Sequence, residues 1–175
     1  YGFSLVSTSP GTASDPDQAL SWRASTNNGG SPGAQDPAPT IPEVVIHEIL
    51  TRGGNTPDFI ELHNPTASAA DVSGWLLSDD SAQPAKFILP QGSIISAGGY
   101  LVINESQFNP AGSNSAFTLG SDGDSIYLFS ALNNGALSGY SHGFTFGAAA
   151  PGISFGRIIL SNGEEDLTPV TKTTP

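Results

Sequence analysis

Residues 43–80 read EVVIHEILTRGGNTPDFIELHNPTASAADVSGWLLSDD and contain three short apolar runs separated by turn residues. The first run, residues 44–50, is rich in β-branched side chains and too short for a convincing helix. The second run, residues 59–63, alternates in polarity, and the third, residues 73–78, follows a polar break. This stretch therefore predicts three β-strands joined by turns.

The rest of the chain continues this pattern. A loop is expected over residues 104–116, and the tail from residue 161 is acidic and then polar, with no strand expected. No apolar pattern of helical spacing extends over more than about two turns. Short alternating strands with turns between them predict an all-β fold with antiparallel sheets, a sandwich or a barrel. Further strands are expected at residues 86–89, 100–103, 125–130, 137–146 and 152–160. The Asn134-Gly135 pair predicts a hairpin in which the strand at 137–146 returns beside the one at 125–130.

The composition narrows the classes of function. The 175 residues carry 5 Lys and Arg against 16 Asp and Glu, a formal net charge of −11. Nucleic-acid binding needs a basic surface, so this charge argues against it and against binding to anionic membranes. There is no cysteine, which excludes disulfides and thiolate metal sites. No apolar run approaches the roughly 18 residues that span a bilayer, so no membrane insertion is expected.

Residues 1–42 are expected to form an N-terminal extension, with the main domain over residues 43–175. The extension ends in a linker rich in Gly and Pro. Its motif Gly2-Phe3-Ser4-Leu5 is similar to Gly152-Ile153-Ser154-Phe155. Two interpretations stay open: the extension closes a preceding module of the same kind, or it is an arm added to this one. Because methionine is absent, the chain is expected to be a fragment of a longer protein.

Across about residues 44–157, the chain resembles a lamin tail domain of the bacterial type. The most specific pieces are ELHN at residues 61–64 and SGWLLSD at residues 73–79. The pieces that follow one another in the order and spacing of that family are VVIHEIL, DFIELHNP, DVSGWLLSDD, KFILP, SIISAGGYLVI, DGDSIYLF and GISFGR.

This resemblance implies an immunoglobulin-like antiparallel β-sandwich that acts as an accessory module without catalytic activity. It also implies a larger bacterial protein that is secreted or exposed at the cell surface. The expected partners are a protein or cell-surface partner and other domains of the same polypeptide. The chain has no coiled-coil rod and no basic patch, so nothing in it points to a nuclear lamin.

Two enzyme motifs are present only in part. Residues 152–156 match G-x-S-x-G, but no helix signal follows and no histidine lies after Ser154, so a strand is expected there. His47 and Glu48 begin an H-E-x-x-H motif, but position 51 is threonine and the run reads as a strand.

One group of residues suits a metal. Glu61 and His63 are two residues apart, so their side chains share one face of the expected strand. With His47 or Asp58 as a third ligand they would hold a metal ion, and a metal-dependent hydrolase using His47, Glu61 and His63 is one alternative function. The competing interpretation is a polar outer face, with Glu61 and Asn64 bonding backbone groups at the strand end.

Asp122 and Asp124 are candidates for a structural Ca²⁺ site, as are Asp79 and Asp80, because Ca²⁺ binds carboxylates on loops. The EF-hand spacing fails, since Ile126 falls at a ligand position. The competing interpretation is turn chemistry, in which Asp side chains bond neighbouring backbone groups. No other cofactor is expected.

A carbohydrate-binding module is the second alternative function, suggested by the sandwich, the acidic surface and two tryptophans. Such a module needs exposed aromatic side chains on one face. Trp75, beside Leu77 on its strand, is instead expected in the core, where large aromatics are usually found. Trp22 in the extension is the better candidate for an exposed aromatic.

Overall fold

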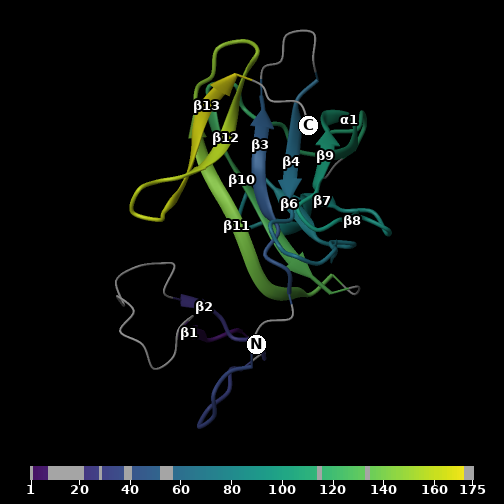
Figure 1. Cartoon of the computed structure of the whole chain (residues 1–175). Helices are drawn as coiled ribbons and strands as arrows, with labels where there is room; N and C mark the ends of the chain where they lie inside the picture. Colours follow the sequence, from purple (N-terminus) through teal and green to yellow (C-terminus); the bar gives the residue numbers. More distant parts are fainter. Residues whose placement is uncertain are drawn as a thin grey trace.

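The computed structural model of the chain describes residues 2–7, 22–27, 29–37, 41–51, 57–113, 116–132 and 135–171. Its main body is a β-sandwich of a five-stranded and a four-stranded sheet, with a short hairpin beside one end (Figure 1). The strands pair in antiparallel fashion throughout these sheets. The predicted immunoglobulin-like antiparallel sandwich is confirmed. No helix in the described part of the chain is long and apolar enough to cross a membrane.

The five-stranded sheet has the order β13-β12-β3-β4-β9. Its central strands are β3 (Val45–Leu50) and β4 (Phe59–His63), both expected from their β-branched or alternating residues. β9 (Tyr100–Asn104) pairs with β4 on one side. β12 (Ile153–Ile159) and β13 (Glu165–Thr171) extend the sheet beyond β3.

The four-stranded sheet has the order β11-β10-β6-β7. β10 (Gly123–Ala131) and β11 (Leu137–Gly147) form the long hairpin that the Asn-Gly pair predicted, although residues 133–134 of its turn lie outside the described residues. β6 (Leu76–Ser78) lies between β10 and β7 (Phe87–Ile88).

Short elements connect the two layers. β5 (Ala70–Asp71) pairs with β8 (Ile94–Ile95) in a small two-stranded sheet. A 3₁₀ turn, η2 (Pro84–Lys86), precedes β7, and α1 (Glu105–Phe108) follows β9. The turn expected at residues 52–57 lies outside the described residues except for Pro57.

The core lies between the two sheets. Ile60 and Leu62 of β4 are fully buried in it, on the shared face that alternation predicted. Trp75 is 4% exposed and packs in the same core as the fully buried Leu77. The predicted core position of Trp75 is therefore confirmed.

Three local predictions were wrong. The acidic tail contains β13, an edge strand whose backbone pairs with β12 although its side chains give little strand signal. The loop expected over residues 104–116 begins with α1, a single turn held by a capping box between Asn104 and Gln107. The strand expected from residue 73 begins only at β6, because Gly74 adopts a φ of 76° in a turn.

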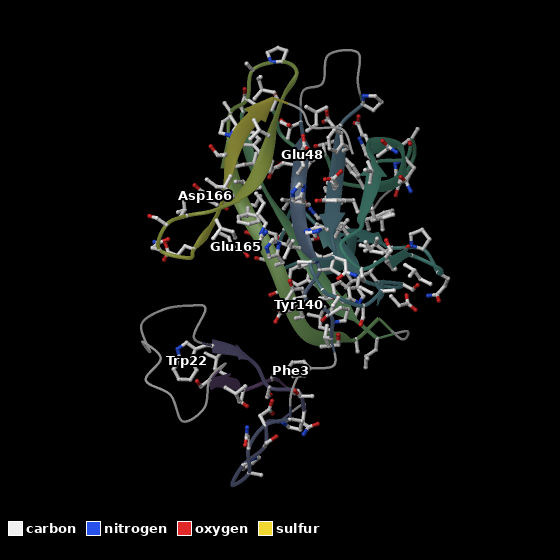
Figure 2. All side chains as sticks on the ribbon, in the orientation of Figure 1. Phe3, Trp22, Glu48, Tyr140, Glu165 and Asp166 are labelled. Atoms are coloured by element: carbon white, nitrogen blue, oxygen red, sulfur yellow. The ribbon has the colours of Figure 1, made fainter. Side chains whose placement is uncertain are left out.

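The N-terminal hairpin consists of β1 (Leu5–Ser7) and β2 (Trp22–Ala24). It contacts the sandwich at β11, where the ring of Phe3 lies so close to Gly139 that an added Cβ would be 3.2 Å from the ring. Figure 2 shows Phe3 at this junction. Residues 38–40 lie outside the described residues, so the boundary between the extension of residues 1–42 and the domain of residues 43–175 stays a prediction.

Candidate functional site

A β-bulge in β3 brings two consecutive side chains to one face of the five-stranded sheet. Ile46 pairs with Leu62 and Glu48 pairs with Glu61, so His47 has no residue opposite it. A bulge of this kind interrupts the alternation of a strand. As a result, His47 and Glu48 both lie beside Glu61, on the face away from the core.

His47, Glu48 and Glu61 form a compact group that we call the His47 cluster. One nitrogen or oxygen atom of each side chain lies within 4.8 Å of the corresponding atoms of the other two. His47 Nδ1 and Glu61 Oε1 are hydrogen-bonded at 2.8 Å. Glu48 is 1% exposed and Glu61 is 2% exposed, whereas the His47 side chain is 29% exposed. Two carboxyl groups are thus buried next to one imidazole.

The rings of His63 and Tyr100 lie next to the His47 cluster. They stack on each other with centroids 4.5 Å apart, and the His47 ring meets them edge-on at 5.5 Å and 5.0 Å. Burial and the nearby His47 lower the pKa of His63, which favours its neutral form. Burial raises the pKa of Glu61, against the opposing effect of its hydrogen bond with His47.

The structure brings together part of the predicted metal-binding set. His47 contacts Glu61 directly and His63 lies beside them, while Asp58 is not part of the His47 cluster. Glu61 lies on the face away from the core beside other polar side chains, as the competing interpretation expected, but it is only 2% exposed and bonds His47. Glu48, which the sequence suggested only through an incomplete motif, completes the group.

Asn64 fulfils the role expected of it at the end of β4. Its side-chain amide donates to the backbone carbonyls of Ser68, Ile95 and Ser96 at 2.8–3.1 Å. Its side-chain oxygen accepts hydrogen bonds from the backbone and the hydroxyl of Thr66. Asn64 is fully buried, so these bonds satisfy polar groups at the turn to β5.

Ser154, the serine of the G-x-S-x-G match, lies in β12 rather than on a strand-to-helix turn. It is fully buried, and its hydroxyl donates a hydrogen bond to Glu48 Oε1 at 2.5 Å. The expectation of a strand at this motif is confirmed. The serine holds the Glu48 carboxylate in place from the neighbouring strand.

A second cluster of polar side chains, around His142, joins the two sheets. The backbone N–H of Ile46 donates to His142 Nδ1 at 3.0 Å, and His142 Nε2 lies 2.8 Å from Glu165 Oε2. Arg157 donates to the other oxygen of Glu165. Burial lowers the pKa of His142, and the Arg157 hydrogen bond, aided by that of His142, holds the pKa of Glu165 at about 2. Because Nδ1 accepts a hydrogen bond, the imidazole proton resides on Nε2.

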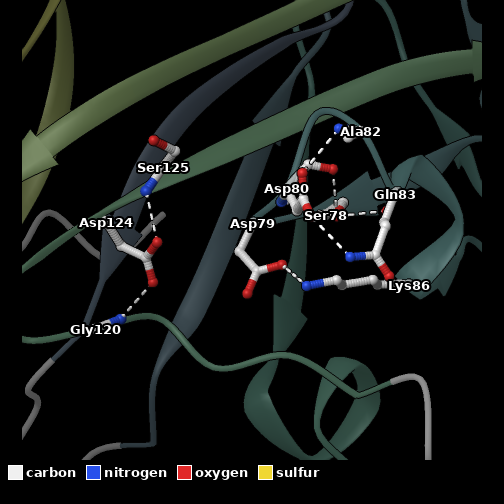
Figure 3. Close-up of polar contacts among 9 residues, drawn as sticks. All are labelled: Ser78, Asp79, Asp80, Ala82, Gln83, Lys86, Gly120, Asp124 and Ser125. Carbon is white, nitrogen blue, oxygen red and sulfur yellow. Dashed lines mark hydrogen bonds and ion pairs between the residues drawn. The ribbon is translucent and has the colours of Figure 1, made fainter.

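The acidic turns that were candidates for Ca²⁺ bind protein groups (Figure 3). Both oxygens of Asp124 accept hydrogen bonds from backbone N–H groups, at 2.9 Å and 2.8 Å. Asp80 likewise accepts from a backbone N–H, and Asp79 forms an ion pair with Lys86 at 2.5 Å. This is the turn chemistry that competed with the metal interpretation. A Ca²⁺ site at Asp122 and Asp124 stays a prediction.

Comparison with known proteins gave one match. The family model described as Lamin Tail Domain matches residues 37–144, which is more than half of the chain. No curated protein and no solved structure matches the chain.

Proposed function

Because the chain belongs to the lamin tail domain family, we propose that it is a non-catalytic structural and interaction module of a larger bacterial protein. We place that protein outside the cell or at its surface. The family assignment supports the role as a module. Its partners are neighbouring modules of the same polypeptide and a protein or cell-surface partner.

One observation carries the proposal of a module among similar modules: the N-terminal hairpin repeats β12–β13. When Gly2-Phe3-Ser4-Leu5 is aligned with residues 152–155, β1 takes the place of β12. Each strand is followed by an antiparallel partner, β2 or β13. In this alignment Leu5 corresponds to Phe155. Trp22, opposite Ser7, corresponds to Leu167, opposite Arg157.

Corresponding residues of the two hairpins differ sharply in burial. Phe155 and Leu167 are 3% and 7% exposed and belong to the core. Leu5 and Trp22 are 73% and 39% exposed, and Figure 2 shows Trp22 pointing away from the sandwich. A two-stranded hairpin is marginally stable in water and needs a surface to pack on. The exposed apolar face of β1–β2 therefore fits the core of a preceding module.

The occupant of this face is the preceding module of the same polypeptide, and Phe3 on Gly139 sets the contact between the two modules. The test compares the chain with a version extended by the preceding residues of its parent polypeptide. Trp75→Phe in both, with any tryptophan of the added residues also replaced by phenylalanine, leaves Trp22 as the single tryptophan. We expect acrylamide to quench Trp22 strongly in the chain and weakly in the extended version.

Trp22→Phe is the matched control, since the remaining Trp75 is 4% exposed and its quenching should be weak in both versions. Equal quenching of Trp22 in the two versions would contradict the proposal and favour an arm added to this domain. Turnover of any substrate by the purified chain would contradict the non-catalytic role. Labelling of intact cells with an antibody to the domain tests the location.

The carbohydrate-binding alternative has less support. Trp22 and Tyr100 are exposed, but they lie on β2 and β9, in separate sheets. Trp75, the other tryptophan, is in the core. The two tryptophans and Tyr100 are thus not lined up on one face, the arrangement that this alternative needs.

A further inference from the structure

The His47 cluster places two carboxyl groups next to each other on the face of the sheet away from the core. Glu48 and Glu61 are both almost fully buried, and their carboxyl groups approach each other within 4.8 Å. Two like charges in a poorly solvated site repel each other strongly. His47 bonds one oxygen of Glu61, and the Ser154 hydroxyl bonds one oxygen of Glu48. A bound cation would offset the repulsion between the two carboxylates.

Two buried polar atoms near the cluster that lack hydrogen-bond partners in the described part of the chain also indicate a bound ion. Glu61 Oε2 is buried and has no hydrogen-bond partner among the described residues. Because the Glu61 side chain is only 3% exposed, bulk water does not satisfy this oxygen either. His63 Nδ1, in the ring beside His47, is also buried and unpaired in the described part of the chain. Buried polar atoms without partners are rare in folded proteins, so an acceptor of this kind indicates a missing ligand.

The donor set suits a transition metal better than calcium. Zn²⁺ binds imidazole nitrogen and carboxylate oxygen at about 2.0–2.2 Å, usually with four ligands. Ca²⁺ takes about 6–8 oxygen ligands, which a site of two carboxyl groups and an imidazole does not supply. The partly exposed His47 side chain opens the cluster to solvent, so an ion has a route of entry.

We propose that the His47 cluster binds a divalent transition-metal ion, with His47, Glu48 and Glu61 as ligands. Zn²⁺ is the probe. The ion takes the place of the hydrogen bond between His47 Nδ1 and Glu61 Oε1. Ser154 keeps the Glu48 carboxylate oriented by its hydrogen bond to Oε1. The ion links β3 to β4 across the bulge.

The test is calorimetric titration of the whole chain with ZnCl₂ at pH 7.5. We expect one equivalent to bind, and we expect His47→Asn and Glu61→Gln each to weaken binding at least about tenfold. Asp122→Asn is the matched control, because it removes an exposed carboxylate of the other candidate metal site. It should leave Zn²⁺ affinity unchanged. Co²⁺ in place of Zn²⁺ should give a visible absorption band that His47→Asn abolishes.

Folding is monitored by circular dichroism, because Glu61 is buried and its substitution affects stability. His47→Asn, at a partly exposed position, keeps the test valid if Glu61→Gln fails to fold. Zn²⁺ should also raise the melting temperature of the unmodified chain, since a ligand that binds only the folded state stabilises it. Absence of binding, equal affinity in His47→Asn, or loss of binding only in Asp122→Asn would each overturn the proposal.

Discussion

The backbone N–H of Ile46 donates a hydrogen bond to Nδ1 of His142 at 3.0 Å, joining residues 96 positions apart in the sequence and on opposite sheets. The bond requires a free lone pair on Nδ1, so it exists only while the imidazole is neutral. Protonation would place two donors against each other in a buried position. The link between the sheets is therefore sensitive to pH.

Stability should fall as the pH decreases below about 6.5. The folded-state pKa of His142 lies below its usual value of 6.5. The contribution of His142 to the free energy of unfolding is therefore fully present above pH 6.5, and it is lost as the pH falls through the folded-state pKa. The pKa of Glu165 is lowered from 4.5 to about 2, so its contribution is present above pH 4.5 and is lost as the pH falls toward 2. Urea unfolding between pH 8 and pH 2.5 measures both.

In the same series, His142→Gln should flatten the pH dependence between pH 7 and pH 5, because glutamine can accept and donate hydrogen bonds without titrating. Unchanged pH dependence in this variant would show that other groups are responsible.

Tyr140→Phe should lower the free energy of unfolding by about 1 kcal/mol. The Tyr140 hydroxyl donates to the backbone carbonyl of Val44 at 2.9 Å and so links β11 to the residue before β3. Tyr127→Phe is the matched control, in which a hydroxyl is removed from β10 without loss of such a link. Urea unfolding of the two variants at pH 8 gives the comparison, and an equal loss in both would contradict this role of Tyr140.

Phe155→Ala should destabilise the chain by about 3–5 kcal/mol, because it leaves a cavity in the core. Leu5→Ala, at the corresponding position of the N-terminal hairpin, should change stability by no more than about 0.5 kcal/mol, because Leu5 is 73% exposed. Thermal and urea unfolding give both values. A large effect of Leu5→Ala would mean that the hairpin packs on this domain.

Gly143→Ala should lower the free energy of unfolding by about 1–3 kcal/mol, because the added methyl group overpacks this site. A Cβ at Gly143 would lie 2.7 Å from the carbonyl oxygen of Ile126, a backbone atom that has little freedom to move. Gly147→Ala, in the same strand, meets nothing within 4 Å and should be nearly neutral. Equal melting temperatures of the two variants would contradict this packing.

Much of the fold was predictable from local pattern. β3 was predicted from its run of β-branched residues, and β4 from its alternating polarity. The burial of Ile60 and Leu62 on one face of β4 followed from the two-residue period of a strand. The Asn-Gly signal gave the β10–β11 hairpin. β13 was not predicted, because this edge strand is held by backbone pairing with β12 and its polar side chains give no strand pattern.

The candidate site was predictable only in part. His47, Glu61 and His63 were identified from their chemistry. Glu48 lies beside His47 and Glu61 because of a bulge in β3, which no residue of that strand predicts. A simple alternating strand would have placed His47 and Glu48 on opposite faces.

The sequence by itself determined where most of the strands lie, that Trp75 belongs to the core and which family the chain resembles, because these depend on local alternation and turn residues. Tertiary structure decided that His47, Glu48 and Glu61 meet and that His142 joins the sheets. It also showed that Leu5 and Trp22 are exposed, whereas Phe155 and Leu167 are buried in the core. These features depend on register and on contacts between distant segments, which the residues of one strand do not encode alone.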